Sequence, residues 1–118
     1  MEDLDKTIQD SDLTLVDFYA TWCGPCKMLS PVLEQLKADL GDGIRIVKVD
    51  VDKNAAMSTR YRIRSVPTLI LFKRGAMVWR QSGTVGLDDL KAKIDKQLRS
   101  GGDVIVTTGL LKAAPKVI

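Results

Sequence analysis

The sequence of 118 residues contains no histidine and only two cysteines. The lack of histidine excludes Ser-His-Asp and Cys-His nucleophilic catalysis, and it excludes every metal site that needs an imidazole ligand. Two thiols in one chain cannot complete a tetrahedral zinc site without two further ligands. Covalent chemistry in this chain is therefore expected to depend on the pair Cys23 and Cys26.

Long apolar runs and a strong charge imbalance are also missing. No apolar run reaches the roughly 18 residues of a membrane span, and the acidic first residues do not have the pattern of a signal peptide. The net charge is only +3, and acidic residues interrupt the basic ones, which favours solvated helix faces over nucleic-acid binding. With 45% hydrophobic and 28% charged residues, the composition is typical of one globular domain. We therefore expect neither a membrane nor a nucleic acid among the partners.

The hydrophobic pattern alternates between helical and strand periodicity. Strands are predicted for residues 13–19, 44–51, 68–72 and 77–82, and helices for residues 2–9, 29–40, 55–61 and 87–98. The segment from Lys73 to Ala76 is predicted to be the turn of a hairpin. Strands that alternate with helices need crossover connections, so the first strands should be parallel and covered on both faces. The predicted class is α/β, with a mixed central sheet between two layers of helices.

Gly101 and Gly102 mark a boundary near the C-terminus. Residues 1–100 are predicted to form one domain, and residues 101–118 a C-terminal extension. Residues 103–108 contain a β-branched run, which favours a strand. Two interpretations of this segment stay open, an additional strand at a sheet edge or a disordered tail.

Cys23 and Cys26 are separated by two residues, a spacing that allows a small disulfide ring. They follow a predicted strand and lie at the start of a predicted helix, where unpaired N–H groups and the helix dipole stabilise an anion. We therefore expect Cys23 to be the more acidic and more exposed thiol, and Cys26 to be more buried and to attack a mixed disulfide formed at Cys23. Pro25 suits the first turn because no helical hydrogen bond is lost there. Two ordinary core cysteines, or half of a metal site shared by two chains, are the alternatives.

The segment Phe-Tyr-Ala-Thr-Trp-Cys-Gly-Pro-Cys-Lys, from Phe18 to Lys27, resembles the active-site segment of the thioredoxin family. The resemblance extends from Leu4 to Arg99. Further motifs match in order and spacing, namely Asp17, Pro31, Val66-Pro67-Thr68 and Gly83. The resemblance implies a thioredoxin-like three-layer fold and a protein-disulfide reductase. It also implies that the redox-active disulfide works without a further cofactor and without a metal.

The resemblance assigns roles to individual residues. Cys23 would be the nucleophile and Cys26 the resolving thiol. Asp17 would be a buried carboxylate beneath the disulfide, with Lys48 as its neighbour in the next strand. A desolvated Asp17 would have a raised pKa and would accept a proton from Cys26. A substrate-binding surface, with Pro67 in the cis form, would be formed by Trp22, Gly24, Pro25, Val66, Pro67 and Gly83.

Three functions stay open at the level of sequence. The favoured one is a monomeric, cytoplasmic thiol–disulfide oxidoreductase, because Gly24-Pro25 is the dipeptide of reducing thioredoxins. Its partners would be disulfide-containing proteins and a thioredoxin reductase as electron donor. The second is a protein-binding module that uses the surface of Trp22, Val66-Pro67 and Gly83, with incidental redox chemistry. The third is a metal site between two chains.

Two features depart from the family pattern. Tyr19 occupies a position where many members have tryptophan. The strand that usually precedes the first helix has no counterpart before residue 13, which leaves one sheet edge without its usual neighbour. We expect residues 103–108 either to cover that edge or to remain free.

Overall fold

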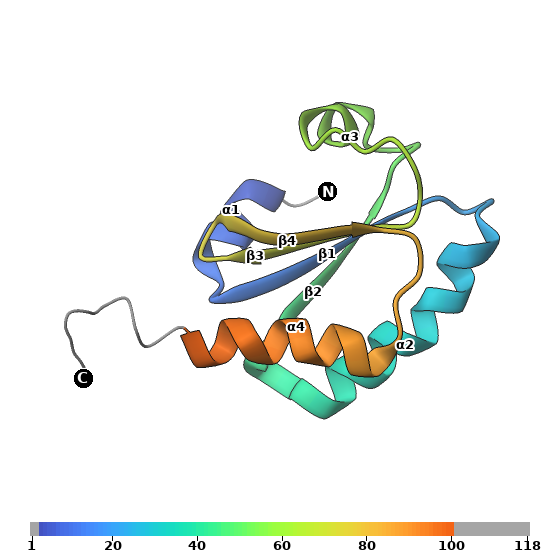
Figure 1. Ribbon diagram of the computed structural model, residues 1–118. Coiled ribbons are helices and arrows are strands. Elements are labelled where there is room, and N and C mark those ends of the chain that lie inside the picture. The colour runs from blue at the N-terminus through green and yellow to red at the C-terminus, as the bar shows by residue number, and fades with distance from the viewer. Residues whose placement is uncertain (1–2, 101–118) are drawn as a thin grey trace. The chain divides into compact units, whose positions relative to one another are not determined.

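The structure is a computed structural model that describes residues 3–100. The chain divides into two units, Met1–Leu87 and Asp88–Ile118, and each is described by itself. The first unit contains four strands and three α-helices, which Figure 1 labels. In chain order these are α1 (Leu4–Asp10), β1 (Leu13–Tyr19), α2 (Gly24–Leu40), β2 (Arg45–Asp50), α3 (Ala55–Arg60), β3 (Thr68–Lys73) and β4 (Ala76–Ser82). The second unit holds α4 (Leu87–Ser100), apart from its first residue.

The order of the elements confirms the predicted alternation of helices and strands. The four strands form one sheet in the order β2-β1-β3-β4. β1 and β2 are parallel, as predicted, whereas β3 is antiparallel to both β1 and β4. The sheet is therefore mixed, and the α/β class with a mixed central sheet is confirmed.

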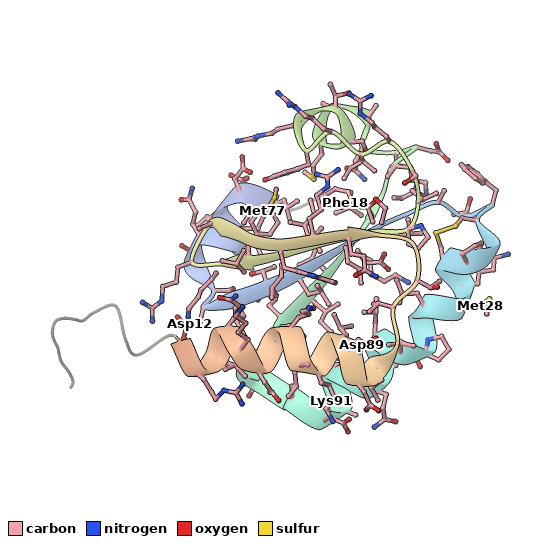
Figure 2. All side chains as sticks on the ribbon, in the orientation of Figure 1. Asp12, Phe18, Met28, Met77, Asp89 and Lys91 are labelled. Atoms are coloured by element: carbon pink, nitrogen blue, oxygen red, sulfur yellow. A yellow bond between two sulfur atoms is a disulfide. The ribbon has the colours of Figure 1, made fainter. Side chains whose placement is uncertain are left out.

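One face of the sheet packs against α1 and α3. Leu4 and Ile8 of α1 are buried in a cluster with sheet residues that include Phe18 and Ile70. Tyr61 follows α3, and its ring packs against this cluster. The centroids of the Tyr61 and Phe18 rings are 5.8 Å apart. Figure 2 labels Phe18 on this side of the sheet. The spacing of four residues between Leu4 and Ile8 puts both side chains on the same helix face, which explains why so short a helix docks here.

The opposite face of the sheet is covered by α2 (Figure 1). This helix buries Leu29, Leu33 and Leu36, whose spacing of three and four residues forms a single apolar stripe. The helix continues through Pro31 and ends at Gly41, which has a φ of 55°. Glycine is suited to this left-handed conformation because it has no Cβ.

The predicted hairpin joins β3 to β4 through the two residues Arg74 and Gly75. Both have positive φ values, 50° and 93°, as a two-residue turn between twisted strands requires. β4 is one outer strand of the sheet and β2 is the other. Among the described residues no strand lies beyond β2. The predicted edge segment 103–108, the rest of the C-terminal extension and its boundary at Gly101 all lie outside the described residues.

In the second unit, α4 has the amphipathic pattern that the sequence predicts. Leu90 and Ile94 are buried and lie four residues apart, whereas Leu98 is 44% exposed. Asp88 and Asp89 occupy the first turn and Arg99 the last, an arrangement that complements the dipole of the helix.

Candidate active site

The sheet topology gathers four chain segments at one edge. Parallel β1 and β2 end at the same edge of the sheet, at Tyr19 and Asp50, which are partners in the register. Antiparallel β3 begins at this edge with Thr68, and β4 ends there with Ser82, again as register partners. The residues just after β1, β2 and β4 and just before β3 are therefore neighbours in space, although they are far apart in the sequence.

The segment after β1 carries the two cysteines, which form a disulfide with 5.3 Å between their Cα atoms. Cys23 is the N-cap residue of α2, and its Sγ accepts a hydrogen bond from the backbone N–H of Cys26 at 3.1 Å. Pro25 lies in the first turn, as predicted, and Gly24 beside it is exposed. Figure 2 shows the disulfide as a yellow bond at the start of α2. The same N–H group can stabilise a thiolate at Cys23 once the disulfide is reduced.

The expected difference in exposure between the two cysteines is not observed. Cys23 is 4% exposed and Cys26 is 5% exposed, so in the disulfide form both are buried. One reason is that the Sγ of Cys23 lies 3.7 Å from the carbonyl oxygen of Val66, so this loop covers it. The prediction that Cys23 is the more exposed thiol is therefore wrong for the oxidised form.

Asp17 is fully buried in the middle of β1, as the sequence predicts. Among the described residues neither carboxylate oxygen has a hydrogen-bond partner. Burial raises the pKa of Asp17 from 3.8 to about 6, and the nearby ammonium group of Lys48 opposes part of this rise. Lys48 is the register partner of Asp17 in β2. A carboxyl group with this pKa can exchange a proton near neutral pH.

The side chain of Lys48 is held beside the disulfide by two neighbours. Its Nζ donates a hydrogen bond to Oγ of Ser30 at 3.3 Å and lies 4.9 Å from the centroid of the Tyr19 ring. These three residues line a cavity of about 260 Å³ together with Cys26 and others. A cavity of this volume, with the Ser30 hydroxyl and the Lys48 ammonium group in its lining, can hold water next to Cys26.

Trp22 lies on the other side of Cys23 and is 70% exposed. Its indole Nε1–H donates a hydrogen bond to a carboxylate oxygen of Asp52 at 2.9 Å, which fixes the ring at the surface. The ring forms one wall of a groove of about 180 Å³. The other residues of this groove are Val51, Ile63, Arg64, Ser65 and Val66. Exposed aromatic rings beside grooves are typical of surfaces that bind other molecules.

The predicted residues from the two remaining segments also meet here. The bond between Val66 and Pro67 is cis, as the resemblance implies. Gly83 donates a backbone hydrogen bond to the carbonyl oxygen of Pro67 at 2.8 Å and has a φ of 91°. A Cβ at Gly83 would meet no atom within 4 Å, so its surroundings are open rather than packed. The structure thus brings Val66, Pro67 and Gly83 to the edge that carries the disulfide.

The sequence prediction missed Asp52, Ser30 and the residues of the groove wall before Val66. Asp52 could have been found, because it follows the second parallel strand and must share an edge with the segment after the first. Ser30 gave no such signal, since a serine four residues after Cys26 on a helix is usually a solvated residue. Only the placement of α2 against β2 brings Ser30 to Lys48.

Within residues 3–100, no group of three or more acidic, cysteine or histidine side chains is close enough to hold a metal ion. None of the helices in this range is both long enough and apolar enough to cross a bilayer.

Comparison with known proteins identifies the family. The thioredoxin family model matches residues 1–96. The chain belongs to the thioredoxin family. A thioredoxin of Staphylococcus aureus is 46% identical over 96 residues, which are 81% of this chain and 91% of that relative. A thioredoxin-like protein of Synechocystis is 56% identical over 69 residues, which are 58% of this chain and 66% of that relative.

Solved thioredoxin structures share the fold. A mutant thioredoxin of Halobacterium salinarum matches with a TM-score of 0.75 and 44% identity, covering 82% of this chain and 84% of the other. The oxidised mitochondrial thioredoxin 3 of Saccharomyces cerevisiae matches with a TM-score of 0.72 and 34% identity, covering 79% and 86%. The fold is a thioredoxin fold. Together with the Cys23–Cys26 disulfide, family membership makes this chain a protein thiol–disulfide oxidoreductase.

Proposed function

We propose that this thioredoxin works as a reductant of disulfides in other proteins, with Cys23 as the nucleophile. The observation that carries the proposal is the disulfide at the start of α2, where Cys23 is the N-cap residue. In the reduced protein the N–H group of Cys26 would stabilise the Cys23 thiolate. This thiolate attacks one sulfur of a substrate disulfide, whose S–S bond breaks as a mixed disulfide forms. The first substrate sulfur leaves as a thiolate and takes a proton from water.

Cys26 then resolves the mixed disulfide. Its thiol transfers a proton to Asp17, directly or through water in the cavity beside Lys48, and the resulting thiolate attacks Sγ of Cys23. The mixed disulfide breaks, the second substrate sulfur leaves as a thiolate and takes up the proton that Asp17 releases, and the Cys23–Cys26 disulfide closes. The substrate gains two electrons and two protons, and this protein loses them. A buried carboxyl group whose pKa is about 6 is suited to accept the proton and to release it.

The groove between Trp22 and Val66 is proposed to hold the substrate chain. It lies beside Cys23, and the carbonyl oxygen of Val66 lies 3.7 Å from Sγ of Cys23, the sulfur that would attack the substrate disulfide. An extended substrate segment could pair with the backbone of Val66 in the manner of an added β-strand. Gly24 and Pro25 are exposed beside the disulfide, and the open space around Gly83 leaves room for a substrate chain at the end of the groove.

The cycle requires an electron donor that reduces the disulfide again, and we propose a thioredoxin reductase for this role. The Gly24-Pro25 dipeptide supports work in a reducing compartment, which we propose to be the cytoplasm. We propose a monomer without a bound cofactor or metal, and neither membrane nor nucleic acid as a partner. Fractionation of cells and analytical ultracentrifugation would test the location and the oligomeric state.

The decisive experiment measures insulin-disulfide reduction together with the reduction potential of the Cys23–Cys26 couple. The wild type should reduce insulin with dithiothreitol as the recycling reductant. Cys23→Ser should abolish the reaction, and Cys26→Ser should accumulate a mixed disulfide detectable by mass. If, in the absence of dithiothreitol, the oxidised protein instead oxidises reduced insulin, the reductant assignment is overturned. A Cys23→Ser, Cys26→Ser double variant that still binds its protein partners would favour a pure binding module.

A further inference from the structure

The C-terminal end of α3 is closed by a motif that usually ends in glycine. The N–H of Ile63 bonds to the carbonyl oxygen of Ser58 at 2.8 Å, and the N–H of Arg62 bonds to that of Thr59 at 3.1 Å. This pair of bonds is the Schellman motif, in which the residue after the helix takes a left-handed conformation. Here that residue is Arg62, with a φ of 54°. A residue with a Cβ is uncommon in this conformation, so something besides local preference must hold it.

Arg80 of β4 supplies this support from another part of the chain. Its guanidinium group donates to the carbonyl oxygen of Tyr61 at 2.5 Å and to that of Arg62 at 2.7 Å. Arg80 pairs in register with Ile70, whose side chain belongs to the cluster beneath α3, so its own side chain leaves the sheet on the same face. The carbonyl groups at a helix end have no partner within the helix. The planar fork of arginine can satisfy two of them at once.

The segment held by Arg80 continues directly into the groove wall. Ile63, Arg64, Ser65 and Val66 line the groove next to Trp22. The far end of the same segment is held by Thr68, whose hydroxyl group donates to the carbonyl oxygen of Ser65 at 2.8 Å. Arg80 therefore fixes the start of the wall and Thr68 fixes its end. Without Arg80 the start of the wall would be held only by the two hydrogen bonds of the Schellman motif and by the packing of Ile63 against the core.

We propose that Arg80 is a positioning residue for substrate binding, because its two hydrogen bonds fix the loop that forms the groove wall beside Cys23. Arg80 does not contact the disulfide, so its loss affects how well a protein substrate is held and not the reactivity of Cys23. This inference rests on the proposed role of the groove. A small disulfide that reaches Cys23 without occupying the groove should not require Arg80.

The test compares two variants of Arg80 with a matched control. Arg80→Met keeps the aliphatic stem and removes all donors, whereas Arg80→Lys keeps the charge but offers a single ammonium group. The control is Arg45→Met, because Arg45 is an exposed arginine at the start of β2, at the opposite edge of the sheet. Each protein is assayed with insulin and with a small aromatic disulfide, and the exchange rate of the Ile63 amide is measured by NMR.

For Arg80→Met we expect KM for insulin to rise about threefold to tenfold at unchanged kcat, the effect of losing two partly solvated hydrogen bonds. The KM of Arg80→Lys for insulin should lie between that of Arg80→Met and that of the wild type. The small disulfide should react at the wild-type rate. The Ile63 amide should exchange faster in Arg80→Met, and Arg45→Met should match the wild type in every assay.

An unchanged KM in Arg80→Met would overturn the inference, and so would an equal loss with insulin and with the small disulfide. If Arg80→Met does not fold, Arg80→Lys decides by the same two criteria. Failure of the proposed function has a different signature, since the wild type itself would then fail to reduce insulin.

Discussion

Asp17 offers a sharp test of the electrostatics of this thioredoxin. The carboxyl group is fully buried, and neither of its oxygens has a hydrogen-bond partner among the described residues. Replacing it by asparagine removes the charge, keeps nearly the same shape and leaves no titrating group at this position. A comparison of the wild type with Asp17→Asn over a range of pH therefore isolates the energy of the buried charge.

The magnitude follows from the shift of the pKa. The pKa of Asp17 rises from 3.8 to about 6 on folding, and at about 1.4 kcal/mol per pH unit this amounts to about 3 kcal/mol. Because the folded protein binds the proton more tightly than the unfolded chain, the free energy of unfolding falls as pH rises through this interval. Below this pH interval the buried carboxyl group is protonated and does not lower the free energy of unfolding, and above it the free energy of unfolding is lowered by the full amount. Relative to the wild type, Asp17→Asn should gain about 3 kcal/mol of stability between about pH 3 and pH 7.

Urea unfolding of the oxidised protein at several pH values is the appropriate assay. The disulfide form is used because its cysteines do not titrate. Other groups that titrate in both proteins cancel in the difference between them, provided that they do not contact Asp17. Asp42→Asn serves as the control, since Asp42 is exposed in the short turn after α2, and its difference from the wild type should stay small at every pH.

Burying the asparagine amide costs the same free energy at every pH. This cost therefore shifts the whole curve of the stability difference against pH without changing its slope. The informative quantity is therefore the change of the difference with pH. If the free energies of unfolding of Asp17→Asn and the wild type run parallel from about pH 3 to pH 7, Asp17 is not a desolvated carboxylate and the reasoning is refuted. The same variant should also slow the resolving step in insulin reduction, because Cys26 loses its proton acceptor.

Three further predictions concern the reactive thiol, the exposed ring and the link to α1. In the reduced protein, iodoacetamide should label Cys23 before Cys26 near neutral pH, and mass mapping that finds the reverse order would contradict the N-cap assignment. Asp52→Ala removes the acceptor that holds the indole of Trp22, so KM for insulin should rise severalfold. Fluorescence anisotropy should report a more mobile ring, and an unchanged anisotropy would count against this role of Asp52. Tyr61→Phe should lower the free energy of unfolding by about 1 kcal/mol through loss of the hydrogen bond to the α1 carboxylate. Tyr19→Phe, which loses no described hydrogen bond, is its control in urea unfolding, and equal losses in both would refute that account.

Much of the site could be predicted because its signals are local. The Cys23–Cys26 spacing after a strand and before a helix predicts an activated thiol, since the helix start itself supplies the stabilising N–H group. The match of Asp17 to the family's buried carboxylate, within an apolar run, predicts a buried carboxyl group with a raised pKa. The hairpin at Arg74–Gly75 follows from the apolar runs on both sides of a short polar turn. For the disulfide and the hairpin, the residues that interact are within a few positions of one another.

The tertiary structure decided what depends on distant segments. The exposure of the two cysteines is nearly equal because the loop at Val66 covers Cys23, and no pattern near the cysteines reveals this. The same holds for Asp52, which fixes Trp22 from a position 30 residues away, and for Arg80, which holds a loop 18 and 19 residues before it. Parallel pairing puts Asp52 near the segment after β1, but side chains of aspartate and arginine usually lie in solvent, so the sequence does not reveal the hydrogen bonds that these two residues make. Pairing of the strands brings the segments after β1 and β2 to one edge and puts Arg80 of β4 on the sheet face beneath α3. The hydrogen bonds of Asp52 and Arg80 form only in that arrangement.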